Sequence, residues 1–183
     1  MPLLTSSESR LITHRPVAGD WWRGGGTIAL ANVKEHVELP TVGQLYAGGT
    51  ISGAWTIAAR TNASSNTGDY SYLFDAQAGR IICGVATTEN GFFAGAWSNV
   101  GLFTASDAIY FLISNGTTIQ AYRSNVAVSS AYSSANDIGG TTRWRNNYND
   151  TTSQWESTVP RAAVYDIALD ATQRAGLYTS MSA

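Results

Sequence analysis

Two short segments of the chain hold the side chains best suited to bind a ligand. One is glycine-rich and contains Trp97 and Asn99, and the other is the densest aromatic–amide group: Trp144, Arg145, Asn146, Asn147 and Tyr148. A flat aromatic ring packs against the apolar face of a sugar, while amide and guanidinium groups bond its hydroxyls. We therefore predict a sugar-binding site made of these side chains: Trp97, Asn99, Trp144, Arg145, Asn147 and Tyr148.

Two other interpretations of the tryptophans stay open. The group from 144 to 148 suits a subunit contact equally well, because aromatic residues and arginine are enriched at protein interfaces. Trp55 and Trp155 are predicted to belong to the hydrophobic core, and Trp144 is a candidate for the same place.

Residues for catalysis are sparse. Glycoside hydrolysis needs two carboxyl groups facing one bond, whereas alternation along a strand places Glu35 and Glu38 on opposite faces. The two histidines, His14 and His36, have no nucleophile-elbow motif beside them and too few cysteine or histidine partners for a zinc site. The sequence predicts a protein that is not an enzyme.

Composition excludes several classes of function. The 183 residues carry a formal net charge of −2, only 13% are charged, and Lys34 is the single lysine, so the cationic stripe that binds nucleic acid is missing. Cys83 is the only cysteine and is predicted to be a buried apolar residue. No apolar stretch is long enough to span a membrane, and the N-terminus does not have the pattern of a signal peptide.

Short strands separated by turn signals dominate the rest of the chain. Alternating residues predict a strand at 50–60, and Asn115-Gly116 predicts a hairpin between strands at 108–114 and 118–123. A final strand at 159–165 leads to a helix at 171–178, with Asp170 as its cap and Gln173 at the capping-box position. The pattern indicates one domain over 1–183: an all-β, two-sheet antiparallel β-sandwich with one short C-terminal helix.

Three further local predictions come from the same rules. Residues 27–31 are predicted to form a strand, and Trp21 and Trp22 to point to opposite faces of another. Asn90-Gly91 predicts a second hairpin turn, and residues 1–20 include a segment that could serve as an N-terminal arm.

Three segments resemble the laminin-G-like domains, which are concanavalin A-like jelly rolls. Thr50-Ile51-Ser52-Gly53-Ala54-Trp55 is similar to a core strand of that family, and the hairpin around Asn115-Gly116 is similar to its central hairpin, with Ser124-Asn125 at the place of a characteristic turn. Tyr165-Asp166-Ile167-Ala168-Leu169 with the helix after it resembles the closing strand and terminal helix. Together these segments cover roughly two thirds of the chain, from Glu35 onward.

The resemblance implies a jelly roll of a superfamily that includes lectins, adhesion modules, glucanases and accessory domains of bacteriophage particles. It implies no resident cofactor, although calcium is common in such domains and Asp69, Asp75, Asp107 and Asp137 stand where strands meet loops. The acidic cluster on one strand that the glucanases use is missing from this sequence.

Two functions fit these observations. The first is a virion structural or decoration protein of a tailed bacteriophage, assembled in the host cytoplasm, which binds other virion proteins and copies of itself and contacts host-surface glycans. The low charge and polar, uncharged composition favour it. The second is a stand-alone carbohydrate-binding adhesin module, and a glycoside hydrolase ranks third. Neither nucleic acid nor membrane insertion is expected.

Overall fold

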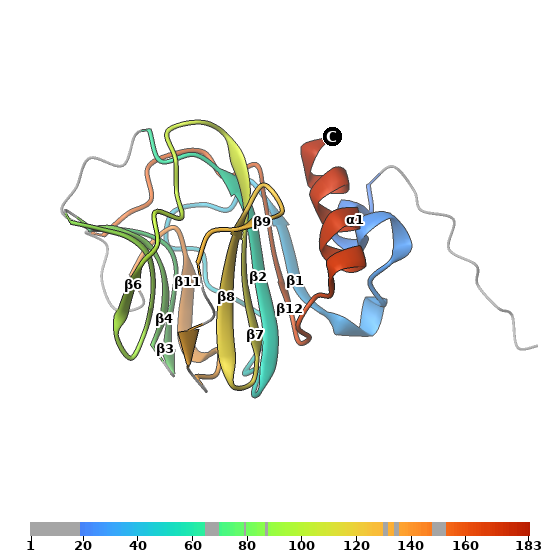
Figure 1. Cartoon of the computed structure of the whole chain (residues 1–183), viewed down its shortest axis with the longest axis horizontal. Helices are drawn as coiled ribbons and strands as arrows, with labels where there is room; N and C mark the ends of the chain where they lie inside the picture. The colour runs from blue at the N-terminus through green and yellow to red at the C-terminus, as the bar shows by residue number, and fades with distance from the viewer. Residues whose placement is uncertain are drawn as a thin grey trace, which may run out of the picture.

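The computed structural model describes residues 19–64, 70–78, 80–86, 88–129, 132–133, 136–147 and 153–183. They form two antiparallel β-sheets, two short 3₁₀ helices and one α-helix (Figure 1). The predicted β-sandwich with one C-terminal helix is confirmed. No helix in the described part of the chain combines the length and apolarity needed to cross a membrane.

The larger sheet, sheet A, occupies the middle of the molecule. Its strand order is β1-β12-β2-β7-β8-β10, with β9 beside β8. The bounds of its strands are β1 Val33–Glu38, β2 Ala54–Thr61, β7 Ala108–Asn115, β8 Thr118–Arg123, β9 Val126–Ala127, β10 Tyr132–Ser133 and β12 Arg161–Tyr165. The predicted hairpin around Asn115-Gly116 joins β7 to β8.

The smaller sheet, sheet B, packs on one side of sheet A with the order β11-β3-β4-β5-β6. Its strands are β3 Tyr70–Ala78, β4 Ile81–Ala86, β5 Glu89–Ala94, β6 Trp97–Asn99 and β11 Gly139–Trp144. The other side of sheet A carries α1 (Ala171–Ser182) and the 3₁₀ helices η1 (Trp21–Gly26) and η2 (Leu30–Asn32), as Figure 1 shows. Sheet B therefore has one covered face and one outer face.

Sheet A is apolar on both faces because it separates two hydrophobic clusters. On β2, the alternating residues Trp55, Ile57 and Ala59 face sheet B, as the sequence predicts. Ala58 between them belongs to the second cluster, which α1 and η1 cover with Leu177 and other side chains. The central strands thus read as nearly continuous buried runs instead of a simple alternation.

The terminal helix begins where the sequence predicts. Asp170 accepts a bond from the Gln173 backbone N–H, and the Gln173 side chain accepts one from the Asp170 backbone N–H, which completes a capping box. The helix runs four residues beyond the predicted end at Tyr178. It lies against η1 so closely that a Cβ on Gly24 would come within 2.8 Å of the Leu177 backbone nitrogen.

Local predictions around the glycines are wrong. The residues predicted as a strand at 27–31 lead into the 3₁₀ helix η2, and Trp21 and Trp22 lie on η1. Gly24 and Gly25 have φ of 55° and 69°, which a strand cannot accommodate and which lets the chain reverse against α1.

Asn90-Gly91 is a strand interior instead of a hairpin turn. Both residues lie within β5. The Asn90 side chain makes two hydrogen bonds with the Phe103 backbone. Asn90 Nδ2 donates to the Phe103 oxygen at 2.8 Å, and Asn90 Oδ1 accepts from the Phe103 N–H at 2.6 Å. Such pairing with a distant segment outweighs the local preference of an Asn-Gly pair for a turn.

Candidate functional site

Trp144, central to the predicted sugar site, lies in the core. Its side chain is 0% exposed and packs edge-on against Phe74 with ring centroids 4.7 Å apart. Trp55 and Trp155 are also fully buried, as predicted. No sugar can reach the Trp144 ring, so this part of the predicted site is corrected: β11 directs Trp144 inward because neighbouring strand residues alternate between faces.

In the described part of the chain, the residues that follow Trp144 make hydrogen bonds that hold neighbouring segments together. Arg145 donates hydrogen bonds to the backbone oxygens of Pro40, Trp155 and Glu156 at 3.0–3.2 Å, and burial lowers the pKa of its guanidinium. Asn146 is 1% exposed, and its side-chain oxygen accepts a bond from the Asn147 backbone N–H. Asn147 is half-buried, and Tyr148 lies outside the described residues.

Trp97, by contrast, belongs to a strip of four aromatic side chains on the outer face of sheet B. The strip runs Tyr70–Tyr72–Trp97–Phe93, with successive ring centroids 6.1, 6.5 and 6.0 Å apart. Tyr70 is 52% exposed, Phe93 and Trp97 are half-buried, and Tyr72 is buried between its neighbours. We call these four residues the aromatic strip.

Two glycines allow the strip to form. Tyr72 lies on β3 and Trp97 on β6, so two strands separate them, or roughly 14 Å at normal strand spacing. Between them, Gly84 of β4 pairs with Gly91 of β5, and Gly84 pairs with Tyr72 on its other side. Gly84 leaves room for the Tyr72 ring, since a Cβ there would lie 2.9 Å from Tyr72 Cδ1, and Gly91 leaves room for the Ser98 backbone of β6. The Tyr72 and Trp97 rings stack at an interplanar angle of 29°.

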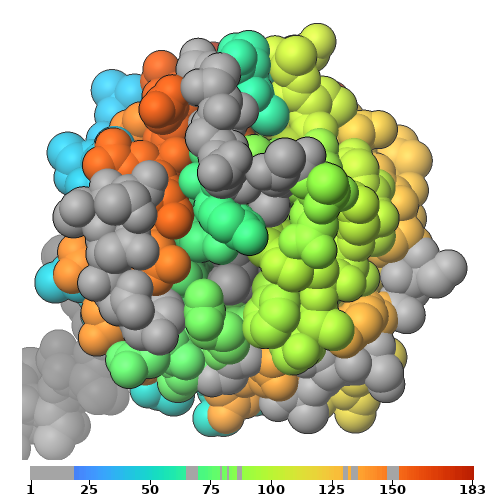
Figure 2. All heavy atoms as spheres, turned by 90° about the vertical axis from the view of Figure 1, so that its left-hand side faces the viewer, coloured from blue at the N-terminus to red at the C-terminus, as the bar shows by residue number. Residues whose placement is uncertain are grey.

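Figure 2 looks onto this face. The surface is hollowed between the β3–β4 region, drawn in green, and the yellow-green ridge of β5 and β6. The aromatic strip belongs to the same outer face of sheet B. A shallow trough with an aromatic wall is the shape that holds an extended ligand by ring stacking.

The charged residues of the face gather at one end of the strip. Asp75 of β3 pairs across the sheet with Arg143 of β11, and its carboxylate lies 3.6 Å from Arg80 Nε. Asp75 is 0% exposed, so the ion pair is protected from solvent on one side. The Arg143 guanidinium also donates to the Gly43 oxygen at 3.1 Å. Asp75 is therefore a buried member of this cluster, and the guanidinium groups of Arg80 and Arg143 are the ones that lie partly at the surface.

Asn99, the other residue predicted beside Trp97, holds the end of sheet B together. Its Nδ2 donates to the Thr88 oxygen at 2.9 Å, and its Oδ1 accepts from the Asn90 backbone N–H at 3.0 Å. These bonds fix β6 against β5 and so position Trp97. Asn99 therefore positions Trp97, and its side-chain amide already bonds the backbone of Thr88 and Asn90.

The face offers no pair of carboxyl groups for glycosidic hydrolysis in its described part. Asp75 lies on β3 and Glu89 on β5, two strand spacings away, and the register offsets them by four residues along the strands. Their separation is therefore roughly 16 Å. Glycosidases hold their two carboxyl groups within about 10 Å. The arrangement of rings, one ion pair and a shallow trough supports binding.

The aspartates considered for calcium do not converge. Asp107 pairs with Arg60 at 2.9 Å, and Asp137 accepts bonds from Ser52 Oγ and the Gly53 backbone N–H at 3.1 Å. Among the described residues, no three acidic, histidine or cysteine side chains form a group that could hold a metal. These residues therefore do not fit a calcium site, and Asp69 lies outside the described part.

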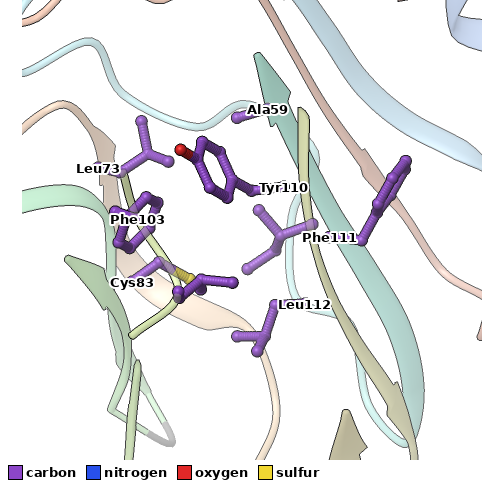
Figure 3. A pocket seen from close by; sticks show the side chains of 9 residues that line it. Ala59, Leu73, Cys83, Phe103, Tyr110, Phe111 and Leu112 are labelled. Carbon is purple, nitrogen blue, oxygen red and sulfur yellow. The ribbon is translucent and has the colours of Figure 1, made fainter. Parts of the chain in front are cut away.

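A separate cavity lies between the two sheets (Figure 3). It has a volume of about 10 Å³ and apolar walls that include Leu73, Cys83, Tyr110 and Leu112, whereas the Phe111 side chain points away from it. A space of this size and polarity is a packing defect that stays dry. Burial raises the pKa of the Cys83 thiol strongly, which makes it a poor nucleophile, in keeping with its predicted role in the core.

Sequence reasoning found one residue of the aromatic strip and missed three. Tyr70 and Tyr72 alternate along β3, a pattern that already indicates a shared face. The contact between the Tyr72 and Trp97 rings depends on the register between β4 and β5, where Gly84 pairs with Gly91. No local sequence pattern predicts that register.

Comparison with known proteins supports the fold. Neither a protein-family model nor the sequence of a curated protein matches this chain. Domain 4 of AbnA, a GH43 extracellular arabinanase from Geobacillus stearothermophilus solved in complex with arabinotriose, superposes with a TM-score of 0.51 and 12% identity, over 69% of this chain and 67% of that one.

Two larger proteins also match this chain over part of their length. A mutant Trypanosoma rangeli sialidase with trans-sialidase activity matches with a TM-score of 0.51 and 12% identity over 83% of this chain, which spans only 29% of that protein. The binding domain of botulinum neurotoxin serotype G matches with a TM-score of 0.48 and 10% identity, over 74% of this chain and 38% of that one. At such identities the likeness concerns the fold alone, a β-sandwich.

Proposed function

We propose that the chain is a non-catalytic carbohydrate-binding module whose ligand lies along the aromatic strip. The observation that carries this proposal is the gathering of four rings from three strands on a face of the sandwich that α1 does not cover. A solvent-accessible strip of rings has no role in the core, which lies on the other face of sheet B.

The chemistry of the face favours a glycan over other ligands. Tyr70, Phe93 and Trp97 offer ring faces for the C–H groups of sugar rings, and the partly exposed guanidinium groups of Arg143 and Arg80 offer donors for hydroxyls. The charges of the cluster balance to within one unit, so the face does not demand a strongly ionic partner. The first ligand to test is arabinotriose, because the similar arabinanase domain was solved with it.

Calorimetric titration with arabinotriose and larger arabino-oligosaccharides tests the proposal, followed by a glycan array if none binds. Trp97→Ala should weaken binding about five- to tenfold, since a stacked ring contributes about 1 kcal/mol or somewhat more. Trp22→Ala is the matched control, because Trp22 is also half-buried but lies on the other side of sheet A. Equal loss in both variants, or no glycan bound by the native protein, would count against the strip as a sugar site.

We also propose a setting for this activity, the surface of a bacteriophage particle, where the module would associate with other virion proteins and with copies of itself. The support is compositional: a surface rich in Ser, Thr, Asn and Gly with only 13% charged residues. Sedimentation of the native protein with intact virions tests it. A protein that stays in the supernatant as a monomer would leave the adhesin module as the better function.

A further inference from the structure

A second groove lies on the opposite side of sheet A, between η1 and the edge strand β1. It has a volume of about 490 Å³, in the range of small-molecule sites, and is lined by Gly19, Trp21, Trp22, His36, Val37 and Glu38. Alternation along β1 turns His36 and Glu38 outward, and η1 places its two tryptophans over them. The proposed glycan site does not involve this groove.

Two tryptophan rings contact the imidazole of His36. The Trp22 ring stacks on it with centroids 4.4 Å apart and an angle of 21°, and Trp21 meets it edge-on at 6.4 Å and 84°. The backbone of η1 is fixed beside them, because the Tyr165 hydroxyl donates to the Trp22 oxygen at 2.9 Å. The groove therefore has a pre-formed aromatic wall, and a ligand would not have to assemble it.

Carboxylates set the charge of the groove. Glu38 Oε1 accepts a bond from Trp21 Nε1 at 3.0 Å, which leaves acceptor sites on its second oxygen. Burial lowers the pKa of the His36 imidazole and outweighs the opposite effect of the Asp20 and Glu38 charges, which favours the neutral form. A neutral imidazole adds no positive charge to oppose a cation.

The nearby cations are engaged with other groups. Lys34 pairs with Asp166 at 2.6 Å, and Arg23 donates to the Ile28 oxygen. Arg161, the register partner of Glu38 on β12, donates to the backbone oxygen of Ser180, and its guanidinium lies 5.6 Å from the centre of the Trp21 ring. In the described part of the chain, no ion pair includes Glu38 or Asp20.

We propose that this groove binds a small organic ammonium ion, held between the Trp22 ring and the Glu38 carboxylate. An aromatic face attracts an ammonium group through its quadrupole, and a carboxylate beside it supplies a full opposite charge. The ammonium group could come from a quaternary amine or from a lysine side chain of a peptide. Because the groove is open to water, each contact is expected to be weak.

The test is a titration of the full chain, labelled with nitrogen-15, followed through the indole Nε1–H resonances of Trp21 and Trp22. Choline and N-acetyl-lysine-methylamide are the two ammonium probes, and they distinguish the two sources. The control ligand is 3,3-dimethyl-1-butanol, the uncharged shape analogue of choline, at matched ionic strength. Concentrations up to about 0.1 M would nearly fill even a 10 mM site.

The expected result is a saturable shift with at least one ammonium probe and none with the alcohol. Glu38→Gln and Trp22→Ala should each weaken binding about two- to fivefold, as expected for exposed cation–π and charge contacts, while Trp97→Ala should leave it unchanged. The proposal is overturned if neither ammonium probe gives a saturable shift, if the alcohol shifts the resonances equally, or if Glu38→Gln binds as tightly as the native protein. Glu38 is exposed and Trp22 is only half-buried, so both variants should fold.

Discussion

Replacing Gly84 by alanine tests how the aromatic strip is assembled. A Cβ at this position would overlap the backbone oxygen of Ser71 and lie 2.9 Å from Tyr72 Cδ1. The Tyr72 ring can rotate away, but the Ser71 oxygen belongs to the β3–β4 ladder and can move only with its strand. We therefore expect both a loss of stability and a displaced Tyr72 ring.

The size of the loss follows from two opposing effects. Crowding in a packed region costs about 1–3 kcal/mol, while alanine restricts the unfolded chain and returns about 0.4–1 kcal/mol. The net change in the free energy of unfolding is about 1–2 kcal/mol. For a chain of this size that corresponds to a fall in Tm of about 3–8 °C.

Differential scanning calorimetry measures the change, with Gly19→Ala as the control. A Cβ on Gly19 would meet nothing within 4 Å and its φ is not positive, so this variant should unfold within about 1–2 °C of the native protein. A Gly84→Ala variant as stable as Gly19→Ala would refute the reasoning, because it would mean that β3 and β4 move apart without cost. Loss of glycan binding in Gly84→Ala would in addition link the strip geometry to function.

Three further outcomes are expected. The Cys83 thiol, whose pKa burial raises strongly, should not react with an aromatic disulfide reagent at pH 8 until urea unfolds the protein, and labelling of the native state would contradict its burial. Asp170→Ala removes the acceptor of the capping box and should lower the free energy of unfolding by about 1 kcal/mol in urea titrations. Asp170→Asn is the control, because asparagine also caps helices and should keep most of the native stability. Burial also raises the pKa of Glu35 above 4.5, so the folded state holds the proton more tightly and loses stability as pH rises through that pKa. Glu35→Gln should therefore stabilise the protein at pH 7, by an amount that shrinks as the pH falls toward 4.5, and an equal effect at both pH values would speak against this origin.

Much of the fold follows from patterns a few residues long. The alternation of Trp55, Ile57 and Ala59 identifies a core strand, and Asp170 with Gln173 marks the start of α1. These signals are local, because a strand's faces and a helix cap depend on residues within one turn or one pleat. The same reasoning was wrong at Asn90-Gly91, where bonds to Phe103 across a distant loop fix the backbone as a strand.

The sequence by itself determined the class of the protein: a β-sandwich with a polar, weakly charged surface and no local motif for catalysis. Only the tertiary structure decided which tryptophans a ligand can reach. Trp97 and Trp144 look alike in the sequence, yet one lies on the outer face of sheet B and the other fills the core. The physical reason is register: a side chain's surroundings depend on which residues lie opposite it two strands away, and that pairing is set by the packing of the whole sheet.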